Sequence, residues 1–192
     1  MHTNLIPIAA LVFAIAACAA GDDRPASAES TPATVSASPA PSSGLDDPTI
    51  VAIFDAANAA DIETGRLAME RGSTKEVRDF GAMLARDHAN VQQQGRDLAR
   101  RLGVTPTPPV DDASAKAHAD AMAMLRTKSG ANFDKAFLDH EVAFHQSVID
   151  ALNGTLLPAI RNAELRQLVV TVAPAFDAHR IAAVNLRAKL GN

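Results

Sequence analysis

The chain has 192 residues, a length typical of one folded domain, and a formal net charge of −4 at pH 7. Mild acidity without a basic run argues against nucleic acid as a partner. There is no Trp or Tyr, and only seven Phe, so the core must consist mainly of Ala, Leu and Val. A single cysteine excludes an intramolecular disulfide and a Cys-x-x-Cys redox centre.

Residues 1–17 have the character of a secretory signal peptide, and their apolar run is too short to span a membrane. The run ends in Ile15-Ala16-Ala17-Cys18, which resembles the lipobox of bacterial lipoproteins. That resemblance implies cleavage before Cys18, lipidation of its thiol, and a lipid-anchored protein of the bacterial cell envelope. Ala19 after the cysteine, in place of Asp, favours the outer membrane, facing the periplasm. An ordinary signal peptide without lipid is the alternative.

Residues 18–46 are expected to form the lipidated cysteine and a disordered tether. The segment is rich in Ala, Ser, Pro and Thr, and it has too few large apolar groups to offset the entropy of ordering. The folded domain is therefore expected at 47–192.

Helix signals dominate this domain. The first helix is expected from Asp47-Pro48 to Gly72, because a capping Asp and a first-turn Pro are typical of a helix start. Its predicted inward face has a spacing of three and four residues: Ile53, Ala56, Ala60, Glu63 and Leu67.

A capping box at residues 73–76 starts the second helix, which Gly103 ends. A proline-rich loop follows, and then a short helix at about 112–128. A fourth helix begins near Asn132, and Gly154 and Pro158 either kink or end it. The last helix is expected from Asn162 to about residue 189. The inward faces of the second, fourth and last helices include Leu84 and His88, Glu141 and His145, and Phe176 and His179.

Four long amphipathic helices and a short one predict an all-α fold, a ferritin-like up-down four-helix bundle with the short extra helix in the crossover. An extended α-solenoid is the alternative, but no motif repeats at a fixed period.

Three of the six histidines lie on apolar stripes of different helices: His88, His145 and His179. If the last two long helices form a hairpin near Asn162, His145 and His179 lie at the same height, each 17 residues from the turn. His88 lies about 15 residues into its own helix and can share that level. Each histidine alone is also compatible with an ordinary hydrogen-bonded core residue.

Two carboxylates could assist the histidines. Glu141 precedes His145 by four residues and shares its helix face, as a ligand, as a group that orients the imidazole, or as a boundary residue. Glu63 is a weaker candidate, because counting from Gly72 places it ~10 Å from the height of His88, at ~1.5 Å per residue.

Imidazoles with one or two carboxylates suit a transition metal such as Zn, Cu or Fe, and not calcium or magnesium. Four or fewer ligands favour one ion over two. A ferritin-type di-iron site needs Glu-x-x-His motifs, and this sequence contains none.

Several short motifs together resemble a bacterial envelope family known only as a domain of unknown function and as predicted outer-membrane proteins. They are the run Asp61–Ala68, Val77 to Phe80, Asp87-His88, Phe133-Asp134, Glu141-Val142, His145, Ala173-Pro174 and His179. The resemblance covers about residues 48–188 and implies a ferritin-like fold. It also implies that Glu63, His88, His145 and His179 are the positions matching the family motif.

Three functions remain open from the sequence. The first is a binding protein, rather than an enzyme, that holds a transition-metal ion. The second is a structural or protein-interaction module with a hydrogen-bonded polar core and no metal. The third is a metal-dependent oxidoreductase. The sequence does not identify a protein partner.

Overall fold

We describe the protein from a computed structural model, which describes residues 45–110 and 112–191. The predicted signal peptide, Cys18 and residues 19–44 of the predicted tether lie outside the described residues. In the described part the regular structure is entirely helical, as the sequence predicts. The helices are α1 (Asp47–Arg71), α2 (Lys75–Leu102), α3 (Ala113–Arg126), α4 (Gly130–Ala151), the π-helical turn η1 (Leu152–Leu156), α5 (Leu157–Ala159) and α6 (Ala163–Lys189).

The helix ends follow local side-chain chemistry. Asp46, Thr74 and Asn162 each accept a hydrogen bond from a backbone N–H of the first turn, at the starts of α1, α2 and α6. Gly103 ends α2 in the left-handed conformation, with φ 66°. The predicted boundaries therefore agree with the structure to within a few residues. The far end of the fourth helix, which the sequence left open, continues through η1 and α5 to Ile160.

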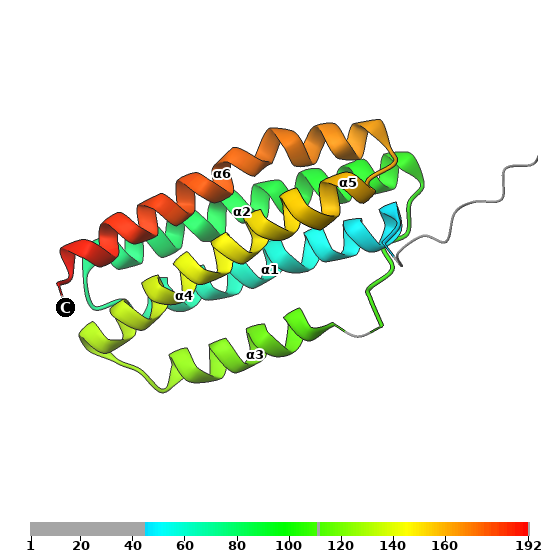
Figure 1. Cartoon of the computed structure of the whole chain (residues 1–192). Helices are drawn as coiled ribbons and strands as arrows, with labels where there is room; N and C mark the ends of the chain where they lie inside the picture. The colour runs from blue at the N-terminus through cyan, green and yellow to red at the C-terminus, as the bar shows by residue number, and fades with distance from the viewer. Residues whose placement is uncertain (1–44, 111, 192) are drawn as a thin grey trace, which may run out of the picture. The chain divides into compact units, whose positions relative to one another are not determined.

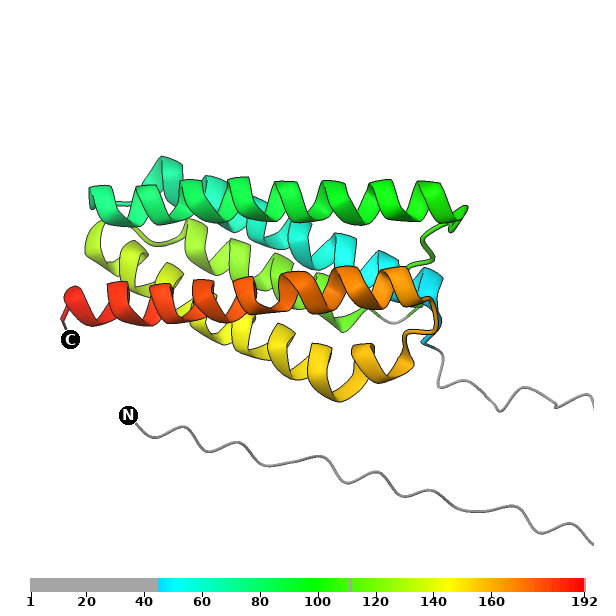
Figure 2. The same cartoon turned by 90° about the horizontal axis from the view of Figure 1, so that it is seen from above.

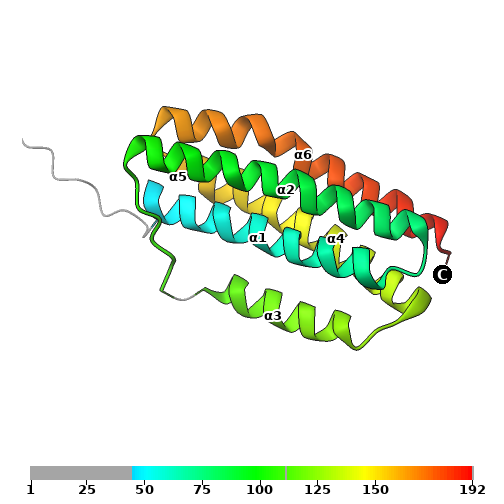
Figure 3. The ribbon, with the colours of Figure 1, turned by 180° about the vertical axis from the view of Figure 1, so that it is seen from behind.

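Four long helices lie alongside one another as two antiparallel pairs, α1 with α2 and α4 with α6 (Figures 1 and 3). Seen from above, α2 and α6 run next to each other in opposite directions (Figure 2). The short helix α3 leads the chain back along α1 and α4, so that α2 and α4 run in the same direction. Because of this arrangement, each long helix is antiparallel to the other long helices with which it packs.

Hydrogen bonds between distant segments fix both ends of the arrangement. At one end, the buried Asp134 of α4 accepts bonds from the backbone N–H and hydroxyl of Ser73 and from the N–H of Thr74, at 2.6–3.1 Å. At the other end, Asp47 of α1 accepts bonds from the N–H groups of Arg161 and Asn162. These contacts set the relative heights of α1, α4 and α6.

Two glycines allow α1 and α2 to approach closely. A Cβ added at Gly65 would lie 2.6 Å from the carbonyl oxygen of Gly81, and a Cβ at Gly81 would lie 2.6 Å from that of Gly65. Neither position has room for a side chain, so the two backbones are in direct contact in the part of the pair next to the turn that joins α1 and α2.

The interior contains two apolar clusters with a polar zone between them. One cluster includes Phe54, Leu98, Leu152 and Phe176, and the other includes Leu67, Leu84, Phe137 and Ala183. Between these two sets each long helix has buried polar residues: Asn58 and Asp61 on α1, His88 on α2, Glu141 and His145 on α4, and His179 on α6. The polar zone therefore crosses the middle of all four helices.

The predicted inward faces of α2, α4 and α6 are confirmed, since their histidines and most of their apolar residues are buried. The predicted face of α1 is confirmed only in part, since Ala60 and Leu67 are buried. Glu63 and Ala56 are exposed, and the stripe that packs inward runs from Phe54 through Asn58 and Asp61 to Gly65. The spacing of three and four residues is the predicted one, but its phase differs by one residue.

None of the helices in residues 45–110 and 112–191 combines the length and hydrophobicity needed for a membrane span.

Candidate metal centre

Five ionisable side chains from all four long helices meet in the polar zone. Asp61, His88, Glu141 and His145 are at most 2% exposed, and His179 is 7% exposed. They form two overlapping groups whose potential ligand atoms lie within 4.8 Å of one another: His88, His145 and His179, and Asp61, Glu141 and His145. These buried groups could hold a metal ion.

The tautomer of His88 follows from its neighbour Asn58. The side-chain amide of Asn58 donates to the carbonyl oxygen of Phe54 at 2.7 Å, which assigns the amide orientation. The Oδ1 of Asn58 therefore faces Nδ1 of His88 at 2.9 Å and accepts its hydrogen. The neutral ring then has a bare lone pair on Nε2, which points into the cluster.

His145 is oriented by its own helix. Its Nδ1 lies 2.9 Å from the carbonyl oxygen of Glu141, one turn earlier on α4, and donates to it. Its Nε2 is buried and has no hydrogen-bond partner. A second lone pair therefore faces the same interior space as that of His88.

His179 completes the set from α6. Its Nε2 lies 3.3 Å from the Oδ2 of Asp87, an acceptor, so that this nitrogen carries the hydrogen. Its Nδ1 lies 3.1 Å from Nε2 of His88. In the assigned tautomers neither of these two nitrogens carries a hydrogen, and each presents a lone pair to the other. Two lone pairs at this distance repel each other unless a cation or proton lies between them.

The two carboxylates add further acceptors. Both oxygens of Asp61 and both of Glu141 are buried without a hydrogen-bond donor. The Oδ2 of Asp61 lies 3.3 Å from Nε2 of His88 and 3.9 Å from Nε2 of His145. The inner surface of the cluster therefore consists of acceptor atoms, an arrangement that is costly in a buried space without a cation or shared protons.

Burial explains the protonation of these groups in the metal-free protein. It lowers the pKa of His88 to about 3 and that of His145 to about 4, because a charged imidazolium is poorly solvated there. The pKa of His179 is lowered for the same reason. Burial raises the pKa of Glu141 to about 7, and burial together with the neighbouring Glu141 raises that of Asp61. Three neutral imidazoles thus adjoin two carboxyl groups that are reluctant to ionise together.

Aromatic rings close the cluster on one side. The ring of Phe176 lies 5.2 Å from that of His88 and 6.1 Å from that of His145, measured between centroids. Phe144 contacts the ring of His145 edge-on. These apolar walls hold the imidazoles in place and keep the local dielectric low.

Glu63 is not part of the cluster. Its half-exposed side chain points toward α3, where it accepts from Arg126 at 2.9 Å and pairs with His118 at 2.9 Å. The carboxylate that α1 contributes is instead Asp61, which sequence reasoning missed. The sequence contains a pattern that could have identified Asp61 as an inward residue. It belongs to a series with a regular spacing of four and three residues: Phe54, Asn58, Asp61, Gly65 and Ala68.

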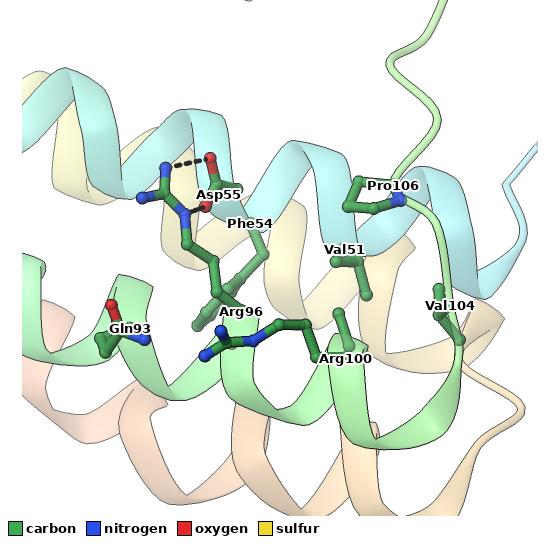
Figure 4. Close-up of a pocket in the computed structure, with 10 residues that line it drawn as sticks. Val51, Phe54, Asp55, Gln93, Arg96, Arg100, Val104 and Pro106 are labelled. Atoms are coloured by element: carbon green, nitrogen blue, oxygen red, sulfur yellow. Dashed lines mark hydrogen bonds and ion pairs between the residues drawn. The ribbon is translucent and has the colours of Figure 1, made fainter.

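A surface pocket of about 330 Å³ lies elsewhere, between α1, α2 and the loop after α2 (Figure 4). Val51, Phe54 and Pro106 give it an apolar lining, and Arg96 at its edge pairs with Asp55. Arg96 lies two turns along α2 from His88, so the pocket is separate from the histidine cluster.

Comparison with known families matches residues 30–186 to the domain of unknown function DUF4142, and the chain belongs to this family. The match begins within the segment expected to be the tether. A search of curated proteins and of solved structures gives no match.

Proposed function

We propose that this protein binds one transition-metal ion at the middle of a ferritin-like bundle, through His88, His145, His179 and Asp61, with Glu141 as a further carboxylate. The observation that carries the proposal is the inward convergence of three imidazole lone pairs and of two carboxyl groups whose buried oxygens have no hydrogen-bond partner. One cation can be bound by either group of three residues, and His145 belongs to both groups.

The spacing of the donor atoms suits a small ion. Nitrogen ligands ~2.0–2.1 Å from a tetrahedral zinc are ~3.3–3.4 Å apart. The separations of 3.1 Å between His88 and His179 and 3.3 Å between His88 and Asp61 are close to this value. Imidazole donors favour Zn, Cu or Fe over calcium and magnesium, which prefer oxygen ligands alone.

A purely structural polar network is the competing explanation. Such a network stabilises a core only when its members satisfy one another. His88 and Asn58 do so, but Asp61, Glu141 and Nε2 of His145 do not. The unpartnered atoms therefore favour metal binding over a structural network.

The lipobox-like sequence at Cys18 supports a place for this domain on the periplasmic face of the bacterial outer membrane, anchored by lipid. Storage, buffering or sensing of a metal ion in the cell envelope would follow. The deep burial of the cluster favours holding an ion over catalysis, which needs an open coordination position.

The test is the metal content of the purified chain after stripping with a chelator and dialysis against Zn²⁺, Cu²⁺ or Fe²⁺. We expect one ion per chain and a rise in melting temperature, since an ion at 100 times its Kd stabilises by about 2.7 kcal/mol. Asp61→Ala and His145→Ala should abolish both effects. Glu63→Ala is the matched control, two residues from Asp61 but outside the cluster, and it should bind as the wild type. No bound metal and no thermal shift in the wild type would refute the proposal.

A further inference from the structure

In each of the three histidines, one ring nitrogen points away from the cluster and donates a hydrogen bond. The three histidines differ in the acceptor of that bond. His88 is held by Asn58, which is fully buried and itself fixed by the carbonyl of Phe54. His145 is held by a backbone carbonyl of α4. Neither of these acceptors can move without disturbing a helix, so both rings are fixed in place.

His179 is held by a partner at the surface. The side chain of Asp87 is 36% exposed, and its Oδ2 accepts from Nε2 of His179 at 3.3 Å. Its other oxygen, Oδ1, accepts from the exposed side chain of Arg86 at 3.0 Å. His179 is also the most exposed of the five residues in the cluster. The cluster therefore reaches solvent through His179 and Asp87.

The carboxylate of Asp87 determines which nitrogen of the His179 ring carries the hydrogen. An ionised carboxylate only accepts hydrogen bonds, so it requires the hydrogen of His179 on Nε2 and leaves Nδ1 bare toward the cluster. An amide at this position could also donate, which would permit the opposite tautomer with a hydrogen on Nδ1. In that tautomer the ring could not bind a cation through its inner nitrogen.

From this contrast we infer that Asp87 is a positioning residue, which holds the inner nitrogen of His179 ready for a cation, and that the ion enters and leaves at the His179–Asp87 edge. The inference rests on the proposed function. The Asp87 carboxylate also provides a negative charge at the surface along this route, next to the one ring that can turn without displacing a buried partner.

The first experiment needs no metal. Nitrogen-15 NMR of the histidine rings in the stripped full chain should show the hydrogen of His179 on Nε2 in the wild type. In Asp87→Asn the Nδ1–H tautomer should appear, and Asp87→Glu should restore the wild-type pattern. An unchanged His179 tautomer in Asp87→Asn would overturn the positioning role, whether or not the protein binds metal.

The second experiment measures the transfer of Zn²⁺ from the loaded chain to an excess of chromogenic chelator. Loss of an outer hydrogen-bond partner typically weakens metal binding about 10–100-fold, so Asp87→Asn should release Zn²⁺ faster by about that factor. Asp177→Asn is the matched control, because Asp177 lies two residues before His179 and pairs with Arg180 instead. It should release Zn²⁺ at the wild-type rate.

The outcomes separate the two proposals. A changed tautomer with an unchanged release rate would overturn the His179–Asp87 edge as the route of the ion. A wild-type chain that binds no Zn²⁺, Cu²⁺ or Fe²⁺ would refute the proposed function and the route with it, while the tautomer experiment would still decide the positioning role. Circular dichroism of each variant checks that the fold is retained.

Discussion

Asp61 and Glu63 lie two residues apart on α1, and their surroundings are opposite. Asp61 is 1% exposed among three histidines, whereas Glu63 is half exposed and pairs with Arg126. The sequence indicated the histidines correctly as inward residues, because each interrupts an otherwise apolar stripe. It could not distinguish the two acids, because α1 is rich in alanine and its buried residues occupy several faces of the helix.

The heights of Asp61 and Glu63 along the first helix, relative to His88, are one property that could have distinguished the two acids. Counting from the turn placed Glu63 about 10 Å from His88, at ~1.5 Å per residue. A residue earlier in α1 reduces that offset, and Asp61 meets this condition. The family resemblance pointed to Glu63 by sequence position, and only the packing of α1 against α2 shows which acid turns inward.

Replacement of Glu141 by Gln should stabilise the metal-free protein at neutral and higher pH. Burial raises the folded-state pKa of Glu141 from 4.5 to about 7, so its contribution is intact below pH 4.5 and is lost as the pH rises through about 7. Gln resembles the protonated acid and avoids that loss, which is about 3 kcal/mol at ~1.4 kcal/mol per unit of pKa. Urea denaturation of both proteins at pH 5 and pH 8 measures the difference.

In that comparison the advantage of Glu141→Gln should be small at pH 5 and near its maximum at pH 8. The exposed Glu70, replaced by Gln, should give little change at either pH. Metal affinity should fall in Glu141→Gln, because the neutral amide is a weaker donor. A variant that is less stable than the wild type at pH 8 would contradict this account.

At the scale of the helices, sequence patterns predicted most of what the structure contains. Capping residues located the starts of α1, α2 and α6 to within one residue, with Asp46 and Thr74 as the caps in place of the expected Asp47 and Ser73. Glycines located the ends of α1 and α2, because these signals act within one turn of the chain. The π-turn at Leu152–Leu156 was not predicted, since Gly154 and Pro158 are equally compatible with a helix end. The contacts between helices depend on partners distant in sequence and could not be inferred from local patterns.

The contact between Gly65 and Gly81 gives a prediction about helix packing. An alanine at either position would place its Cβ 2.6 Å from a backbone oxygen of the facing helix, so α1 and α2 must move apart. We expect Gly65→Ala and Gly81→Ala each to destabilise the protein by roughly 1–3 kcal/mol in urea denaturation. Gly154→Ala is the control, since nothing lies within 4 Å of its added Cβ. Equal stability of all three variants would show that the helices tolerate the wider spacing.

The bonds of Asp134 give a second prediction for the same pair of helices. Asp134→Ala removes the acceptor for two backbone N–H groups and one hydroxyl at the turn between α1 and α2. Hydrogen bonds to a charged group contribute about 1.5–3 kcal/mol each, although not additively, so we expect a loss of roughly 3 kcal/mol. Asp139→Ala removes only an exposed ion pair with Arg187 and should cost less than 1 kcal/mol. The midpoints of thermal or urea unfolding compare the two.

At the scale of the whole molecule, the packing of the four long helices places one cluster of ionisable side chains at the middle of the bundle. All-helical architecture was predictable from composition and periodicity. The two pairs of helices and the path of α3 determine which residues share a height, and they bring His88 and His179 together across 91 positions of sequence. The proposed site is therefore a property of the assembled fold and not of any one segment.

This arrangement predicts that the histidines and the carboxyl groups of the cluster have opposite effects on the pH dependence of the metal-free protein's stability. The folded-state pKa values of His88 and His145 are about 3 and about 4, below the unfolded value of 6.5. Their contribution to stability is therefore present above pH 6.5 and is lost as the pH falls toward 4, by up to about 1.4 kcal/mol per pH unit for each histidine. Burial raises the pKa values of Glu141 and Asp61, so these two groups gain stability over the same range and oppose this loss. We therefore expect the melting temperature in the presence of a chelator, measured from pH 7 to pH 4, to fall more steeply in Glu141→Gln than in the wild type, because the variant lacks one of the opposing groups.

The two apolar clusters have a consequence for how the protein denatures. Because the polar zone interrupts the apolar interior of all four helices, the metal-free domain has two separate centres of hydrophobic stabilisation. An ion bound to all four helices would join these halves into one cooperative unit. We therefore expect calorimetry to give a broad or two-step transition without metal and a single sharp one with it, so that the ion determines whether the domain unfolds as a whole or in parts.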